Sequence, residues 1–138
     1  MTTMPTPLPI PQLLDEWLKW AEWISTPEPR ADGSALTGWD EFEWITRDRP
    51  EHAWAAILAA VRDPRCTPYL NTLAAGPMED LLSYHGALFI DRVEAQARSD
   101  PRFASFLGGV WRFEMTDDVW ARVQAVWDRR GWDGIPSE

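Results

Sequence analysis

The sequence predicts an all-α fold, in which a single domain is built as an irregular bundle of about six to eight helices. Apolar residues recur at helical intervals through most of the chain, as they do on the buried face of a helix. No stretch of useful length alternates apolar and polar residues as a half-buried strand does. Glycines, prolines and short carboxylates separate the apolar stripes, and these residue types are typical of helix ends.

The 138 residues suffice for one domain with its own core, which we expect over residues 12–131. Residues 1–11 hold four prolines and should be extended or disordered, and residues 132–138 should form a tail. The sequence Asp63-Pro64-Arg65 recurs as Asp100-Pro101-Arg102. This spacing of roughly 35 to 40 residues leaves a solenoid-like stack of helical hairpins as an alternative to the compact bundle.

The N-terminal half predicts three helices. The first spans residues 12–25 and the second residues 39–47, with a loop rich in proline and glycine between them. Asp48 should cap the third helix, and Glu51 three residues later completes a capping-box pattern. Asp63-Pro64 should end that helix, because the residue before a proline avoids the helical conformation.

Glycine and proline set the boundaries that we predict in the middle of the chain. Thr67-Pro68 looks like an N-cap followed by a proline at the first helical position, and this turn should end at Gly76 in a left-handed stop. Pro77 should open a short helix that ends at Gly86, before a longer helix over residues 87–98. We expect at least one of the two glycines to have a positive φ.

The C-terminal third is divided by the same residue types. Asp100 should cap a helix that starts at Pro101, and Gly108-Gly109 should end it in a tight turn that lets Trp111 fold back onto the core. Thr116 should begin the last helix and Gly131 should end it. A single core should contain Trp54, Leu81, Phe89, Val93, Leu107, Trp120 and Val123.

The central stretch also carries a recognisable set of motifs. These are Ala75-Gly76-Pro77-Met78-Glu79-Asp80-Leu81-Leu82, His85-Gly86, Asp100-Pro101 and Leu107-Gly108-Gly109-Val110-Trp111. Over about residues 54–126 the chain resembles an uncharacterised bacterial family of small, acidic, helix-rich proteins, a domain of unknown function. The resemblance implies a helical fold and marks special positions, but this family has no established activity to carry over.

Glu79, Asp80 and His85 form the most polar cluster of these motifs. Two carboxylates and an imidazole can act as base, acid or metal ligands, which would suit a small metal-dependent hydrolase. A structural interpretation is favoured. Both carboxylates lie in the first turn after Pro77, where the helix dipole favours negative charge, and a histidine is favoured near the end of that helix. All three remain candidates for contact with a partner.

The composition favours a protein partner over nucleic acid. The formal net charge of -9 repels phosphate backbones and suits a basic partner. Ten tryptophans are far more than usual, and Trp23 is the ring of the first helix that we expect to be exposed for contact. Asp117 and Asp118 are first-turn acids of the last helix and are further contact candidates.

The single cysteine, Cys66, excludes a disulfide within the chain. We expect a free structural thiol, although the neighbouring Arg65 could lower the pKa of a reactive one. The N-terminal residues do not resemble a signal peptide, and no window is apolar enough for a membrane span. The expected location is the cytoplasm.

These observations predict a non-catalytic protein-binding module that needs no cofactor or metal. The leading hypothesis is an immunity or inhibitor protein that neutralises a basic partner such as a bacterial toxin or effector. An accessory or scaffold subunit of a bacterial complex is the alternative. The hydrolase built on Glu79, Asp80 and His85 comes third.

Overall fold

The computed structural model describes residues 6–130 of the chain, and this part contains helices and no strand. The elements are α1 (Ile10–Ser25), α2 (Gly38–Asp48), α3 (Pro50–Arg62), the 3₁₀ helix η1 (Pro64–Tyr69), α4 (Leu70–Leu73), the π-helical segment η2 (Ala74–Met78), α5 (Glu79–Ser99), α6 (Pro101–Leu107) and α7 (Asp117–Val126). The all-α bundle and its expected number of helices are confirmed. No helix within these residues is long and apolar enough to cross a membrane. The predicted stop at Gly131 and the tail at 132–138 lie outside the described residues.

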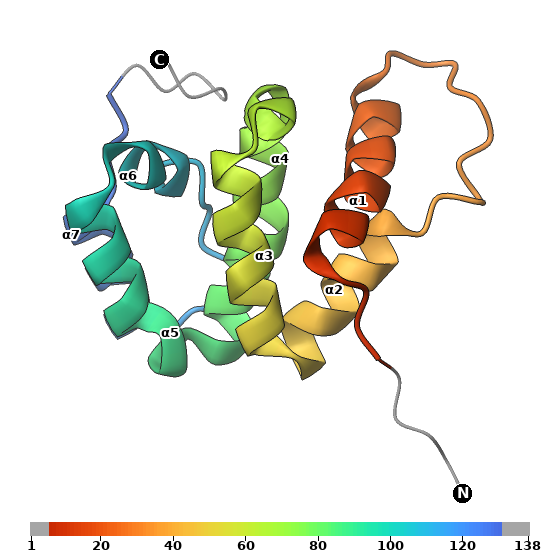
Figure 1. Ribbon diagram of the computed structural model, residues 1–138. Helices are drawn as coiled ribbons and strands as arrows, with labels where there is room; N and C mark the ends of the chain where they lie inside the picture. Colours follow the sequence, from red (N-terminus) through yellow and green to blue (C-terminus); the bar gives the residue numbers. More distant parts are fainter. Residues whose placement is uncertain (1–5, 131–138) are drawn as a thin grey trace, which may run out of the picture.

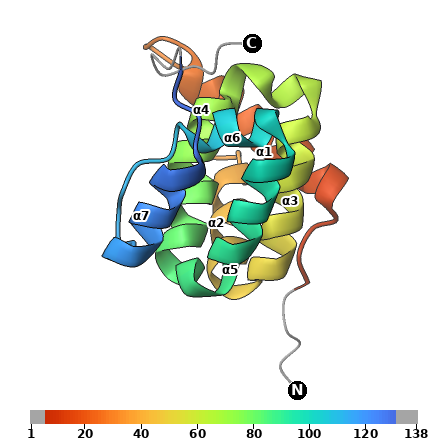
Figure 2. The same ribbon diagram turned by 90° about the vertical axis from the view of Figure 1, so that its left-hand side faces the viewer.

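The helices form a bundle around α5 and not a linear stack. In a solenoid each repeat contacts only its neighbours in sequence, whereas α5 packs against α2, α3, α6 and α7. Helix α1 covers α2 and α3 on one edge of the molecule, and α7 forms the opposite edge (Figure 1). Figure 2 shows α6 and α7 beside α5 on the face away from α1.

One core runs through the whole bundle, as the apolar stripes predict. Every residue of the predicted core is buried except Trp120, which is half-buried and packs its ring against Trp127. Trp54 of α3 packs against both α5 and α6, because its ring centroid lies 6.0 Å from that of Phe89 and 5.8 Å from that of Phe103. Aromatic pairs at these separations stabilise the fold beyond the area that they bury.

Helix starts that depend on a side-chain cap are mostly as predicted. Asp100 accepts a hydrogen bond from the backbone N–H of Arg102 at 3.0 Å, and Thr116 caps α7 by accepting from Val119 at 3.2 Å. Asp63 makes the same contact with Arg65 N at 2.9 Å, so the recurring Asp-Pro-Arg sequence is a recurring N-cap. That cap starts η1 at Pro64, and the predicted cap at Thr67 is therefore wrong.

Two predicted boundaries in the N-terminal half are also wrong. Asp48 is the last residue of α2, and α3 begins directly at Pro50 without a side-chain cap. Arg49 alone makes the turn (φ −137°, ψ 60°), which leaves no room for a separate capping residue. Helix α1 starts at Ile10, inside the segment expected to be extended, because Pro11 fits the first turn of a helix.

The glycine stops of the middle segment are the largest correction. Neither Gly76 nor Gly86 has a φ in the left-handed region. Gly76 and Pro77 lie inside η2, which runs without interruption from α4 into α5, and the wider π turn accommodates the missing N–H of the proline. The break lies at His85 (φ −135°, ψ 28°), where α5 changes direction at the lower end of the molecule in Figure 1.

Gly86 is needed because α7 packs closely against α5 there. A Cβ atom at this position would lie 3.0 and 3.1 Å from the two γ-methyl groups of Val119. The absent side chain, and not a special backbone angle, lets the two helices approach.

Gly86→Ala should therefore lower the free energy of unfolding by about 1 kcal/mol, through overpacking against Val119. Trimming the neighbour should relieve the overpacking, so the double variant Gly86→Ala/Val119→Ala should lose less than the sum of the two single losses. Urea denaturation of the four proteins measures this coupling. Strictly additive losses would show that the two residues do not interact.

Candidate docking surface

The sequence predicts that Glu79 and Asp80 lie in the first turn of a helix that begins at Pro77. In the structure they do not lie at a free helix N-terminus. The backbone N–H of Glu79 already bonds to the carbonyls of Ala74 and Gly76, because α4, η2 and α5 are continuous. Both carboxylates are half-buried. Burial, with the charge of Asp80, raises the pKa of Glu79 to about 7. Burial and the nearby Glu43 raise the pKa of Asp80, against the opposing charge of Arg47.

His85 makes its hydrogen bond to α2 and not to either of these carboxylates. Its Nε2 atom lies 2.9 Å from the backbone carbonyl oxygen of Arg47, so the imidazole fastens the bend of α5 to the end of α2. No group of three His, Cys, Asp or Glu side chains within residues 6–130 could hold a metal ion. The structure does not bring Glu79, Asp80 and His85 together as a metal site.

The position of Glu79 predicts how stability depends on pH. Because its pKa is raised in the folded protein, folding binds a proton, and stability should fall as the pH rises from the ordinary value of 4.5 through about 7. Glu79→Gln should remove this loss and raise stability at pH 8 by about 1 kcal/mol after solvent screening, or a few degrees in Tm.

Thermal unfolding of wild type and Glu79→Gln from pH 5 to pH 8 tests this expectation. Asp118→Asn removes an exposed carboxylate of α7 and serves as the control, which should leave the pH profile unchanged. A Glu79→Gln profile that falls as steeply as the wild-type profile would show that another group carries the dependence.

Cys66 is a buried thiol of the core, as expected. Burial, together with the charge of Asp63, raises its pKa to about 11, and the opposing charges of Arg65 and Arg102 do not compensate. The guanidinium of Arg65 is instead hydrogen-bonded to Asp63 and Asp15. The alternative of a thiol activated by Arg65 is therefore wrong.

Trp23 is not the exposed contact residue that the helix pattern predicts. Its Nε1–H donates a hydrogen bond to the carbonyl of Ala31 at 2.7 Å, and the guanidinium of Arg30 lies 4.9 Å from the centroid of its ring. The backbone at Gly33 lies so close to the ring that a Cβ atom there would be 2.6 Å from it. Trp23 thus orders the loop between α1 and α2.

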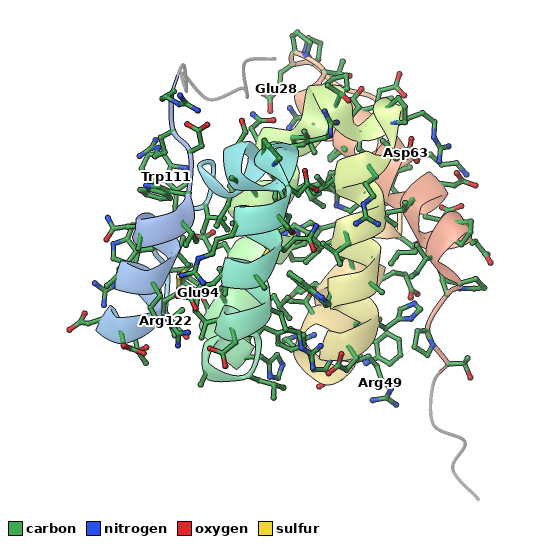
Figure 3. The ribbon with its side chains drawn as sticks, turned by 60° about the vertical axis from the view of Figure 1, so that its left-hand side comes forward. Glu28, Arg49, Asp63, Glu94, Trp111 and Arg122 are labelled. Carbon is green, nitrogen blue, oxygen red and sulfur yellow. The ribbon has the colours of Figure 1, made fainter. Side chains whose placement is uncertain are left out.

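Trp111 is predicted to fold back onto the core, but it is exposed. Gly108 and Gly109 do end α6, but the residue that returns to the core is Val110, which is 3% exposed. The side chain of Trp111 is 68% exposed and lies at the edge of the molecule in Figure 3. A short valine fits the space beneath this loop, and the larger ring is left outside.

Four large apolar side chains are exposed at the bend of α5 and in the loop between α6 and α7. We define them as the docking surface: Tyr84 (44% exposed), Leu88 (58%), Trp111 (68%) and Phe113 (56%). The first two flank the bend of α5, and the other two belong to the loop between α6 and α7. The backbone N–H of Glu114 donates to Ser83 Oγ at 3.2 Å and so joins the loop to the bend.

A pocket of about 360 Å³ opens within the docking surface. It is lined by residues 82–88 at the bend, together with Thr116 and Val119 of the neighbouring loop and helix. The bend itself creates this space, since a straight helix would pack evenly against α7. Its lining offers apolar groups and hydroxyls, and it has room for a single side chain of a partner.

Carboxylates outnumber cations around the docking surface. Asp91, Glu94, Glu114, Asp117 and Asp118 are five carboxylates, and Arg112 and Arg122 are two guanidiniums among them. Arg122 bonds Glu94 at 2.5 and 3.0 Å and Asp91 at 2.5 Å, and so ties α7 to α5 (Figure 3). Asp117, a predicted contact residue, pairs with Arg112 and stays largely exposed. Asp118 is exposed beside it.

Sequence reasoning identified none of the four apolar residues of the docking surface as contact residues, because it placed Trp111 in the core and did not single out Tyr84, Leu88 or Phe113. Tyr84 and Leu88 have helical spacing of their own, off the buried stripe that contains Leu81 and Phe89. An apolar pair outside the buried stripe was therefore a signal that was available. Phe113 carried no such signal, because it lies in a segment without helical periodicity.

Comparison with known proteins gives one family. A family model described as "Family of unknown function (DUF6869)" matches residues 27–131, which is more than half of the chain and includes the whole docking surface. Helix α1 lies outside the matched range. No curated protein and no solved structure matches the chain.

Proposed function

We propose that this chain, which belongs to the DUF6869 family of unknown function, is a non-catalytic protein-binding module of the immunity or inhibitor type. It would act in the bacterial cytoplasm by covering and neutralising a basic protein partner such as a toxin. The observation that supports this proposal is the docking surface, in which Tyr84 and Leu88 line a pocket, Trp111 and Phe113 are exposed in the adjoining loop, and carboxylates outnumber cations.

These carboxylates, the rim of the docking surface, would act first, while the partner approaches. Glu114 and Asp118 belong to no ion pair among the described residues, and Asp91 and Asp117 stay more than four-fifths exposed although each pairs with an arginine. Such carboxylates attract a basic surface over distances of about a Debye length and raise the association rate. The bound arginines keep the rim side chains fixed, which lowers the entropy lost on docking.

The apolar residues would then hold the partner in place. Aromatic rings that become fully buried commonly dominate the binding energy of an interface, and Trp111, Phe113 and Tyr84 are three such rings. Leu88 and the pocket at the bend would receive one apolar side chain of the partner. His85 supports this arrangement indirectly, because its bond to Arg47 fixes the bend.

An accessory or scaffold subunit remains the alternative, and the effect on the partner separates the two. An inhibitor abolishes the activity of its partner when it binds, whereas a scaffold leaves that activity intact. The purified partner, assayed with and without the chain, gives this answer directly.

Affinity capture from the native host tests the proposal. Wild type should retain a basic protein, and the variant Trp111→Ala/Phe113→Ala should bind that protein at least roughly tenfold more weakly, because two anchors are lost. Both side chains are exposed, so the variant should remain folded. Ala55→Ser on the exposed side of α3 is the control and should bind normally. Equal retention by all three proteins would rule out this surface.

A further inference from the structure

A second aromatic group lies on the edge of the molecule opposite α7, where α1 packs against α2 (Figure 1). The rings of Trp20 and Trp39 have their centroids 6.4 Å apart and are inclined at 40°. Trp39 is 42% exposed, and Trp20 is half-buried between Trp39 and the core residue Trp17. The pair therefore offers one open ring that is supported from behind.

Carboxylates flank both rings. Glu16 precedes Trp20 by one helical turn of α1, and Glu43 follows Trp39 by one turn of α2, so each carboxylate shares a helix face with its ring. The two helices are in backbone contact here, because Gly38 lies against the carbonyl of Glu16. This close approach brings the two rings together, and each ring has a carboxylate one turn away on its own helix.

The chain itself shows which group such a ring and carboxylate accept. The guanidinium of Arg30 lies 4.9 Å from the Trp23 centroid and bonds to Glu28 at 3.1 Å. The guanidinium of Arg92 lies 4.8 Å from the Phe89 centroid and bonds to Glu51 at 2.5 and 2.7 Å. In both cases one arginine covers a ring and reaches a carboxylate beside it.

No guanidinium within residues 6–130 covers Trp39 in this way. Glu16 is held by Lys19 at 3.0 Å, whereas Glu43 has only a long contact of 3.9 Å to Arg47. Trp39 thus keeps an open ring face, and Glu43, one helical turn away, is 28% exposed and pairs only at long distance with Arg47.

We propose that Trp39 and Glu43, supported by Trp20, form a site for an arginine side chain of a second protein segment. A guanidinium stacks its plane on the indole and donates two parallel hydrogen bonds to a carboxylate, which an ammonium group cannot do. The net charge of -9 favours such a basic segment. Trp39 lies where α1 packs against α2, whereas Trp111 and Phe113 belong to the loop between α6 and α7, so the two sets of rings can be tested separately.

The test titrates the full chain with a short peptide of consecutive arginines and follows the indole N–H signals by NMR. The same peptide made with citrulline, which is neutral and has the same shape, is the ligand control. We expect a saturable shift of the Trp39 signal with the arginine peptide and none with the citrulline peptide. Trp39→Leu should weaken binding roughly three- to thirtyfold, because it keeps the apolar bulk and removes the π face.

Two further variants make the result specific. Glu43→Gln should weaken binding without altering the ring, and Trp111→Leu, on the docking surface, should leave it unchanged. Wild-type affinity in both Trp39→Leu and Glu43→Gln would overturn the proposal, as would a shift centred on the Trp111 signal. Trp39→Leu and Glu43→Gln test the arginine site, whereas Trp111→Leu and the variant Trp111→Ala/Phe113→Ala test the docking surface. Failure of one proposal can therefore be distinguished from failure of the other.

Discussion

Gly38→Ala should lower the free energy of unfolding by about 3 kcal/mol. A Cβ atom at residue 38 would lie 2.2 Å from the carbonyl oxygen of Glu16 and 2.5 Å from Cα of Trp17. These are backbone atoms that cannot rotate away, so α1 must move off α2. The movement would also open the contact between Trp17 and Phe42, whose ring centroids are 6.2 Å apart.

Gly76→Ala provides the matched control for this substitution. Nothing lies within 4 Å of a Cβ atom at Gly76, and the residue sits in a helical segment where alanine is favoured. It should be neutral or raise stability by up to about 1 kcal/mol. Urea denaturation of both variants measures these changes in the free energy of unfolding. A loss below about 1 kcal/mol for Gly38→Ala would show that α1 is not held against α2 as described.

Leu81→Ala should lower the free energy of unfolding by about 2–5 kcal/mol. Leu81 is fully buried in α5, the helix that contacts α2, α3, α6 and α7. Removing its isobutyl group loses the transfer free energy of the buried atoms and leaves a cavity between helices that have no freedom to close it.

Leu88→Ala makes the same chemical change in the same helix on an exposed side chain. Leu88 is 58% exposed, so its loss should alter stability by less than about 0.5 kcal/mol. Chemical denaturation of the two variants compares the faces of α5 directly. Similar losses at the two positions would mean that the buried face is assigned wrongly.

Features that depend on nearby residues could be predicted from the sequence. Asp100 and Thr116 cap helices because a short side chain bonds an N–H two or three residues away, and no other part of the chain is needed for that contact. The buried stripe through Leu81, Phe89 and Val93 follows from helical periodicity alone.

Features that depend on packing between distant segments could not be predicted. A side chain at Gly86 would collide with Val119, and one at Gly38 would collide with the backbone of α1. Both glycines are therefore explained by close packing and not by a special φ angle. Whether a tryptophan is exposed also depends on packing between distant segments. Trp23 is covered by a loop that happens to fold onto it, and Trp111 is displaced by the smaller Val110.

Only part of the candidate site could be predicted, because the rest depends on contacts between segments far apart in the sequence. The rim residues Asp117 and Asp118 were identified because first-turn acids have a local signature. The pocket exists only because α5 bends at His85 and the loop before α7 returns to Ser83, which are contacts between segments far apart in the sequence.

The association rate between the chain and the captured basic partner tests the central claim most directly. It should be measured across a range of salt concentrations for wild type and for Trp111→Ala/Phe113→Ala. If an acidic rim steers the partner onto apolar anchors, the rate for both proteins falls as salt rises, and the variant dissociates at least roughly tenfold faster. An association rate that does not change with salt, together with wild-type dissociation of the variant, would contradict the proposed docking surface.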